Sequence, residues 1–538
     1  MSPWDAPAVV LEGEDREAGE ALTNDDAAWA LTCAFLILTM QTGFAMLECG
    51  CVSTKNATNI MIKNVIDVSV GGIAYWAFGY ALSFGRPANL FCGLGQFFFS
   101  PPRTGAGYGS EFSQYFFQFS FATTATTIVS GAVAERVKLH AYMAFSFLNT
   151  FVYCIPCGWA RRTPDNSTTT TGGTGGAGWL HTLGFFDFAG VGIVHVNGGA
   201  SALVAAAMIG PRKGRFDTGQ PIPMNSPITS LTGMFMLWWA WLGFNCGSTF
   251  GVSGQLWKVT TVVAVTTLNG AIGGGLVGLL LSMLLNRGRV LVDHVIITVL
   301  GGLVSVTGVA SVTSPREALL IGAVGAGCAV GGTILLERLR VDDPVQAVPV
   351  HLVAGLWGVL AVGLFAEDNE THELRGQHGL FHGGGARLLG IQTVGLLAVT
   401  LWSALCSLLC LLLIRATIGL RPSADEEAFG ADYVEHGLPR AYNRDRLEKV
   451  LDLVVADEHA IQRLEQLVKQ AQWQNQQGPP PIGIATITSR PPPPPVPTPK
   501  QSRQEKVSQL VTEARLRVRS LQVHSKPSSH DNSLPAIA

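Results

Sequence analysis

The stretch that decides the fold is GFFDFAGVGIVHVNGGASALVAAAMIGPR, which runs from Gly184 to Arg212. Most of it is apolar, and a helix needs about 20 such residues to cross the hydrocarbon core of a bilayer. A lone acid, Asp187, stands at its start, and a lone imidazole, His195, lies inside it. Ionisable groups are costly inside a membrane helix and usually face the bundle interior, so His195 is a candidate functional residue.

A second stretch, VDDPVQAVPVHLVAGLWGVLAVGLF (residues 341–365), repeats this arrangement. Both contain the pattern Asp-x7-His-x3-Gly, formed by Asp187, His195 and Gly199 in the first and by Asp343, His351 and Gly355 in the second. A five-helix unit that is repeated and inverted would bring both histidines together near the bilayer midplane. The alternative is two separate core histidines, each satisfied by a backbone carbonyl.

Composition supports the membrane interpretation. Of the 538 residues 48% are hydrophobic and only 14% are charged, and the mean hydropathy is +0.31. A soluble domain carries about 25% charged residues, so we predict an all-α membrane protein. The net charge of −2 gives no indication of nucleic-acid binding. Residues 1–26 are acidic and lack a basic n-region, so no cleaved signal peptide is expected.

The apolar runs predict eleven transmembrane helices. They cover about 27–48, 62–84, 113–133, 140–158, 188–209, 228–248, 259–285, 292–311, 318–337, 344–366 and 388–414. Lysine and arginine are concentrated in alternate short loops, which places the N-terminus outside and the C-terminus in the cytoplasm. We therefore expect an extracellular segment (1–26), a transmembrane domain (27–415) and a cytoplasmic tail (416–538).

Two segments lie outside the predicted bundle. The extracellular loop 161–177 is of low complexity and holds the sequon Asn166-Ser167-Thr168, a predicted glycosylation site. The tail contains a predicted amphipathic helix over 443–474 and two proline runs that favour polyproline II. A linker is the preferred interpretation of these runs, and a cytoplasmic partner of the proline-rich tail is left open.

Aromatic side chains form a second candidate group. Phe117 and Phe121 lie four residues apart on the third predicted helix and therefore on one face, and Phe244 precedes Ser248 by four residues on the sixth. An aromatic face attracts a cation by roughly 0.5–2 kcal/mol, and a hydroxyl can accept a hydrogen bond from N–H. The alternative for each phenylalanine alone is packing against lipid or a neighbouring helix.

We expect no metal, no cofactor and no enzymatic activity. Asp187 and Asp343 stand two turns from their histidines, roughly 12 Å along a helix, which is too far to share a metal ion. Both acids instead suit helix starts, where the dipole stabilises a negative charge, and Asp343 is taken as a structural acid. No nucleophile accompanies the histidines, so no catalytic residue is assigned.

Together these features resemble the ammonium transporter family (Amt/Mep/Rh), most closely its eukaryotic ammonium transporters, over about residues 25–437. The motifs that carry the resemblance are QTGFAMLECG (41–50), STKNATNIMIKN (53–64), FQFSFATTATTIVSGAVAER (117–136), DFAGVGIVHVNGG (187–199), WLGFNCGS (241–248), DDPVQAVPVHLVAGLWG (342–358) and HGLFHGGG (378–385). The resemblance implies a homotrimer with one pore per subunit, set in the plasma membrane. It also implies eleven helices with the N-terminus outside, as the charge pattern does.

The resemblance further implies roles for individual pore residues. His195 and His351 look like the twin histidines that line the pore. Phe117, Phe121 and Phe244 match the phenylalanines that gate and line it.

At the external ammonium site the match is incomplete. Ser248 matches the hydroxyl of that site, and Asp187 matches the acid that supports it indirectly. Trp159 aligns with the first tryptophan of the family pattern, but Arg161 stands where the cation-recruiting tryptophan is expected. Either Trp159 or Trp179 substitutes, or the site is weakened and made electropositive.

The expected function is ammonium transport. An unpaired ion of this size costs on the order of 20 kcal/mol to move into a low dielectric, by idealised Born arithmetic. We therefore expect NH4+ to be recruited outside and deprotonated, so that ammonia crosses past the histidines, which are also able to relay a proton. The alternatives are an ammonium sensor that signals through its tail and a neutral gas channel of the Rhesus type.

Overall fold

The computed structural model describes residues 22–104, 107–164, 176–217, 222–369 and 374–438. Within these ranges the regular structure is helical, apart from one isolated bridge between Ala88 and Gly93. The predicted all-α class is therefore confirmed. The predictions for residues 1–21, for glycosylation at Asn166 and for the tail helix and proline runs after residue 438 lie outside the described residues.

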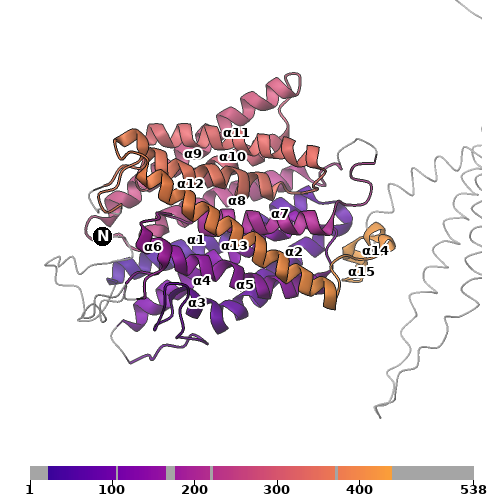
Figure 1. Cartoon of the computed structure of the whole chain (residues 1–538). Coiled ribbons are helices and arrows are strands. Elements are labelled where there is room, and N and C mark those ends of the chain that lie inside the picture. The colour runs from indigo at the N-terminus through magenta and orange to yellow at the C-terminus, as the bar shows by residue number, and fades with distance from the viewer. Residues whose placement is uncertain (1–21, 105–106, 165–175, 218–221, 370–373, 439–538) are drawn as a thin grey trace, which may run out of the picture. The chain divides into compact units, whose positions relative to one another are not determined.

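The helices of the first half follow the predicted order (Figure 1). They are α1 (Asn24–Cys51), η1 (Thr54–Asn56), α2 (Ala57–Ala74), η2 (Tyr75–Gly79), α3 (Tyr80–Phe84), α4 (Tyr108–Ala132), α5 (Leu139–Arg161), α6 (Trp179–Leu183), η4 (Val191–Val196) and α7 (Asn197–Ile209). The helices η2 and η4 have the wider π-helical turn and each runs directly into the α-helix that follows it.

The second half continues in the same way. Its helices are α8 (Pro227–Cys246), η5 (Gly247–Thr249), α9 (Leu256–Leu285), α10 (Val292–Val306), α11 (Pro315–Leu339), η6 (Val348–Val353), α12 (Ala354–Phe365), η7 (Leu380–His382), α13 (Arg387–Thr417), α14 (Ala424–Phe429) and α15 (Ala431–Val434). Like η4, η6 is a π-helix that runs straight into an α-helix.

Each of the eleven predicted ranges falls on one of these helices or on a continuous run of two or three of them. Among the described residues, eight helices are long and apolar enough to cross a membrane, and α10 is apolar but only 15 residues long. The structure thus supports a multi-pass membrane protein. The count of eleven crossings, the inverted repeat and the orientation of the termini stay predictions.

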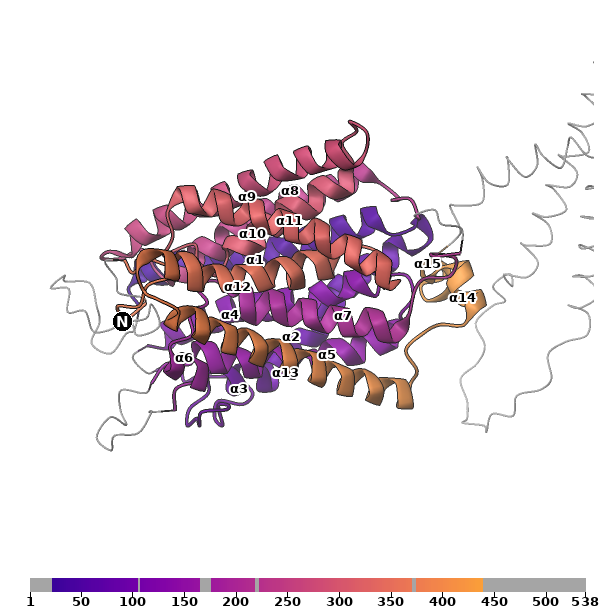
Figure 2. The same ribbon diagram turned by 45° about the horizontal axis from the view of Figure 1, so that its top comes forward.

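The long helices lie side by side, with α6 at one end of the bundle and α14 and α15 at the other (Figures 1 and 2). Burial separates an inner from an outer group. The apolar stretches of the two helices that carry the histidines, Val191–Ile209 and Val348–Phe365, are 78% and 72% buried. The apolar stretches of α13 and α9 are only 28% and 33% buried. The outer faces of α9 and α13 carry exposed leucines, as a surface that meets lipid or another subunit does.

Capping chemistry sets several helix starts. Thr23 and Asp26 form a reciprocal capping box at the start of α1, and Ser314 and Glu317 do the same at α11. Pro315 follows directly at the first helical position, where its missing N–H costs nothing. These local signals explain why each helix begins where it does.

The interior also holds ionisable residues that the sequence-based reasoning overlooked. Asp67 lies inside α2 without exposure and accepts hydrogen bonds of 2.8 Å from the hydroxyls of Thr127 and Tyr142. Glu48 accepts from Ser130 Oγ at 2.5 Å and is equally buried. The two histidines are therefore not alone as ionisable residues inside the helices, and hydrogen bonds offset the cost of burying these acids.

At the end that holds α14 and α15, the first part of the predicted tail packs on the helical bundle. Asp432 accepts from the backbone N–H groups of Thr58 and Asn59 at 3.0 and 2.7 Å, at the start of α2. Glu435 accepts from the N–H of Leu139, the first residue of α5, at 2.8 Å. The tail residues up to 438 thus cap the ends of two long helices.

Candidate functional site

The two histidines meet at the centre of the bundle. Their Nδ1 atoms lie 3.1 Å apart, and the ring centroids are 5.2 Å apart in a stacked arrangement. His195 is fully buried and His351 is 4% exposed. When both rings are neutral, the Nδ1–H of one donates a hydrogen bond to the Nδ1 lone pair of the other. The predicted meeting of the two imidazoles is therefore confirmed as geometry.

The shared sequence pattern explains how the histidine helices come so close. Each histidine lies in a π-helical segment, η4 or η6, which continues into an α-helix. A Cβ added to Gly199 would lie 2.4 Å from the backbone nitrogen of Leu352, and one added to Gly355 would lie 3.0 Å from Cγ2 of Val196. Each glycine therefore leaves room for the other repeat, which lets the two histidine helices cross.

The acid of each repeat binds the backbone at the start of its histidine helix. Asp187 is 7% exposed, and both of its carboxylate oxygens are used. They accept hydrogen bonds of 2.9–3.0 Å from the N–H groups of Gly190, Gly192 and Ile193. Asp343 accepts from the N–H of Val348 at 2.7 Å. Both acids thus accept hydrogen bonds at the start of a helix, where the helix dipole favours a negative charge.

The three predicted phenylalanines form one stack above His195. Phe121 and Phe244 lie face to face with ring centroids 4.1 Å apart, and Phe117 packs against Phe121 at 5.0 Å. Phe244 in turn lies 5.6 Å from the ring of His195. All three phenylalanines are fully buried. Helices α4 and α8 therefore hold two nearly parallel rings next to the histidine pair, a group that we call the phenylalanine gate (Phe121 and Phe244).

Ser248 follows the gate along the chain. It lies in η5, just after the end of α8, and is 1% exposed. Its hydroxyl donates to the carbonyl oxygen of Phe244 at 2.9 Å. With its proton committed in this way, the oxygen offers its lone pairs as acceptors.

Trp159 packs on aromatic rings outside the phenylalanine gate. Its ring contacts are with Trp402 at 5.1 Å, Phe91 at 5.5 Å and Trp179 at 5.7 Å. The side chain over Phe121 is Arg161, whose Cζ lies 5.2 Å from the ring centroid. The ring of Phe121 is thus paired with Arg161, while Trp159 and Trp179 pack on each other.

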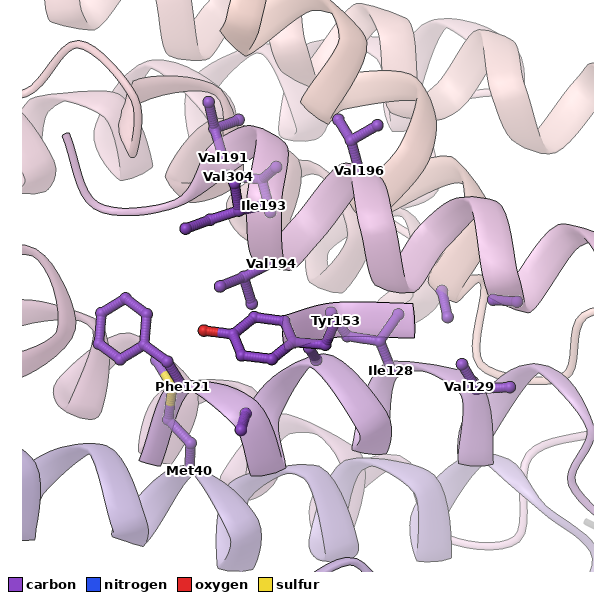
Figure 3. Packing of buried hydrophobic residues seen from close by; sticks show 14 of the residues in the cluster. Met40, Phe121, Ile128, Val129, Tyr153, Val191, Ile193, Val194, Val196 and Val304 are labelled. Carbon is purple, nitrogen blue, oxygen red and sulfur yellow. The ribbon is translucent and has the colours of Figure 1, made fainter. Parts of the chain in front are cut away.

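Two further residues of this site were not singled out from the sequence. Trp241 stacks on His195 with centroids 4.9 Å apart, and its Nε1 donates to Thr307 Oγ1 at 2.9 Å. Its position three residues before Phe244 on α8 is the signal that could have found it. Tyr153 is 1% exposed, and its hydroxyl is directed toward Phe121 (Figure 3).

Several buried polar atoms in this part of the bundle have no hydrogen-bond partner among the described residues. They are His195 Nε2, Tyr153 Oη and Trp159 Nε1. Buried polar atoms are nearly always paired, so these atoms point to a polar molecule that visits the site. In the part of the chain that the structure describes, no group of three or more His, Cys, Asp or Glu side chains is placed to hold a metal ion.

Comparisons with known proteins agree with the geometry. A family model described as Ammonium Transporter Family matches residues 28–441. Putative ammonium transporter 3 of Caenorhabditis elegans is 37% identical over 439 residues, which are 79% of this chain and 62% of that protein. The chain thus spans less than two thirds of that relative.

Solved structures show the same fold. One described as Sensor Amt Protein aligns with a TM-score of 0.69 and 29% identity, over 77% of this chain and 98% of the other. The crystal structure of Mep2 from Candida albicans aligns with a TM-score of 0.66 and 27% identity, over 75% and 88%. The helices that carry the site are therefore arranged as in proteins of this group.

Proposed function

The chain belongs to the ammonium transporter family, and on this premise we propose that it transports ammonium across a cell membrane as ammonia, through a pore lined by His195 and His351. The single observation that carries the proposal is the buried pair of imidazoles, 3.1 Å apart between Nδ1 atoms, beneath the phenylalanine gate. Because its family is one of transporters, we propose transport and assign no enzymatic reaction.

The path begins at the outer mouth. Ammonium gathers near Ser248 and Asp187, loses a proton and passes between Phe121 and Phe244 as ammonia. An apolar, water-poor passage disfavours the ion, because its desolvation costs several kcal/mol even after relaxation. Ammonia has three N–H donors and one lone pair, and so needs few partners on the way.

The histidine pair supplies those partners. Once the two Nδ1 atoms share one proton, the Nε2 atoms are left as one acceptor and one donor. His195 Nε2 is buried and has no hydrogen-bond partner among the described residues. Ammonia is therefore able to donate to one imidazole and accept from the other. A proton passed along the same pair would make the transport carry charge.

The test is flux through the full-length protein in proteoliposomes. His195→Ala or His351→Ala removes a buried hydrogen-bonding group worth roughly 1–3 kcal/mol, and flux should fall by about 10- to 100-fold. His140, an exposed histidine at the start of α5, provides the matched control His140→Ala. Unchanged flux and selectivity in both pore variants would overturn the proposal.

The assembly is proposed to be a homotrimer in the plasma membrane, with one pore per subunit. The exposed apolar faces of α9 and α13 support contact with lipid or with other subunits. The subunit count is testable by native mass spectrometry of the detergent-solubilised protein. A monomer at concentrations that support transport would contradict this part of the proposal.

A second candidate function is an ammonium sensor. It is favoured by the contacts of Asp432 and Glu435 with the starts of α2 and α5, which couple the tail to helices of the bundle. One similar solved structure is also described as a sensor Amt protein. If sensing is the role, removal of residues 439–538 should abolish signalling and spare flux, whereas a pure transporter would show no signalling to lose.

A further inference from the structure

The structure places a permanent positive charge against the gate. Arg161 is the last residue of α5 and is only 2% exposed. Its guanidinium lies over the ring of Phe121, with Cζ 5.2 Å from the centroid. An arginine side chain remains protonated at any physiological pH. The outer side of the gate thus carries a resident cation.

Hydrogen bonds hold this guanidinium in place. Its Nη2 donates to the carbonyl oxygen of Phe188 at 3.0 Å and makes a longer contact of 3.4 Å with that of Asp187. These carbonyls belong to the segment that leads into η4. The arginine therefore bridges the end of α5 to the start of the first histidine helix.

The guanidinium of Arg161 also covers the face of the Phe121 ring that a substrate cation would contact. Phe244 stacks on Phe121 at 4.1 Å and covers one face of that ring. The guanidinium lies over the ring as well, so it is left with the other face. A cation–π contact between NH4+ and Phe121 would have to displace either an aromatic ring or a bound guanidinium.

Like charges strengthen this exclusion. An ammonium ion about 5 Å from the guanidinium, at the effective dielectric constant of about 20 that describes protein sites, is disfavoured by roughly 100-fold. Both oxygens of the Asp187 carboxylate bind backbone N–H groups at the start of η4. The charge of Arg161 also acts on this carboxylate, so part of the negative charge of Asp187 is already balanced by the arginine and by the N–H groups.

We propose that Arg161 is a specificity-determining residue that keeps cations off the phenylalanine gate, so that only neutral amine enters the pore. This inference rests on the proposed transport of ammonia. Ammonium then splits into ammonia and a proton on the outer side of Arg161. The N–H bond that breaks leaves its electron pair on nitrogen, and the proton passes to external water and stays there. Transport is electrically neutral.

The test uses methylammonium uptake by the full-length protein at a fixed total concentration and at external pH 5.5 to 7.5. An alkylammonium titrates near pH 10, as lysine does, so the free base rises about tenfold per pH unit in this range. Uptake by the unmodified protein should rise in proportion and carry no current. A saturable ammonium current at pH 5.5 that is independent of the free base would overturn the inference without any mutation.

Variants of Arg161 then locate the effect. Arg161→Gln and Arg161→Trp remove the charge, and we expect the KM for ammonium to fall by about 100-fold, the pH slope to flatten and a current to appear. Arg161→Lys retains the charge and should keep both the slope and the absence of current. Arg103→Gln, at an exposed arginine between α3 and α4, is the surface control.

The two proposals fail in different ways. If Arg161→Gln transports with the KM and pH slope of the unmodified protein, the role of Arg161 is contradicted while ammonia transport stands. If no form of the protein takes up amine above empty liposomes, the proposed function itself fails.

Discussion

The two histidine repeats share a backbone design and differ at their ends. In both, an acid eight residues ahead of the histidine binds the first turn of a π-helical segment, and a glycine four residues beyond lets the other repeat approach. The first repeat, however, begins beside Arg161 and has its histidine next to Phe244. The second repeat begins beside a cluster of ion pairs.

That cluster lies at the opposite end of the bundle, next to α14 and α15. Asp342 binds Arg212 through a hydrogen bond of 2.8 Å from Nε to Oδ2, and Arg212 also pairs with Glu135 at 2.5 Å. Arg136 donates to the backbone carbonyl of Asp342. Under the proposed function, the duplicated core lines a shared pathway, whereas the residues outside the duplication make one end selective and supply ion pairs at the other end.

The largest expected effect tests the two acids. Asp187→Ala leaves three buried N–H groups unpaired, at about 1–3 kcal/mol each, so the variant should lose roughly 3–9 kcal/mol of stability. Asp343→Ala leaves one, that of Val348, and should lose about 1–3 kcal/mol. Thermal unfolding of the purified variants in one detergent measures the difference. Equal losses would show that the two helix starts are held by something other than these carboxylates.

The next effect tests the two glycines. In Gly199→Ala the new Cβ meets the backbone of Leu352 and of His351, which cannot move aside, so we expect a loss of about 1–3 kcal/mol. In Gly355→Ala the nearest atom is a side-chain methyl of Val196 at 3.0 Å, and the loss should stay below about 1 kcal/mol. Fluorescence-detected size-exclusion chromatography after heating measures the thermal stability of the two variants. The reverse order would contradict the crossing geometry.

A smaller effect, on flux, is expected from the aromatic ring that contacts each imidazole. His195 is stacked on Trp241, whereas His351 has Phe44 in a tilted contact at 6.1 Å. Trp241→Phe loses the hydrogen bond to Thr307, about 1 kcal/mol, and flux should drop about fivefold. Trp239→Phe, at a tryptophan that is 61% exposed, should leave flux as it was. Similar drops in both variants would assign the effect to general destabilisation.

The smallest effect appears only in acid. Burial alone raises the pKa of the Asp342 carboxyl, but the hydrogen bonds and charge of Arg212 outweigh burial and hold that pKa below its ordinary value. A carboxyl with a lowered folded-state pKa adds stability above its unfolded pKa of about 3.9, and this stability is lost as the pH falls through the lower folded value. Asp342→Asn should therefore narrow the stability difference between pH 6 and pH 3. If Asp342→Asn lost as much stability between pH 6 and pH 3 as the unmodified protein, Asp342 would not contribute to the loss of stability in acid.

Much of the site was accessible from sequence because its signals are local or repeated. The spacing Asp-x7-His-x3-Gly predicted that His195 and His351 would meet, and they do. Periodicity put Phe117 and Phe121 on one face, where they pack together. Contacts between side chains on different helices were harder to predict from the sequence. Trp241 stacks on a histidine of another helix, and the contact between Arg161 and Phe121 joins α5 to α4.

The sequence by itself determined the class of the protein, the positions of its apolar helices and the pairing of its two histidine stretches. Hydropathy, charge placement and an internal repeat are properties of residues close together in the chain, and each has a direct physical meaning in a bilayer. Tertiary structure alone decided which side chain covers the gate. Trp159 and Arg161 are two residues apart on α5, so they project in different directions. Packing turns Trp159 toward Trp402 and brings Arg161 over Phe121.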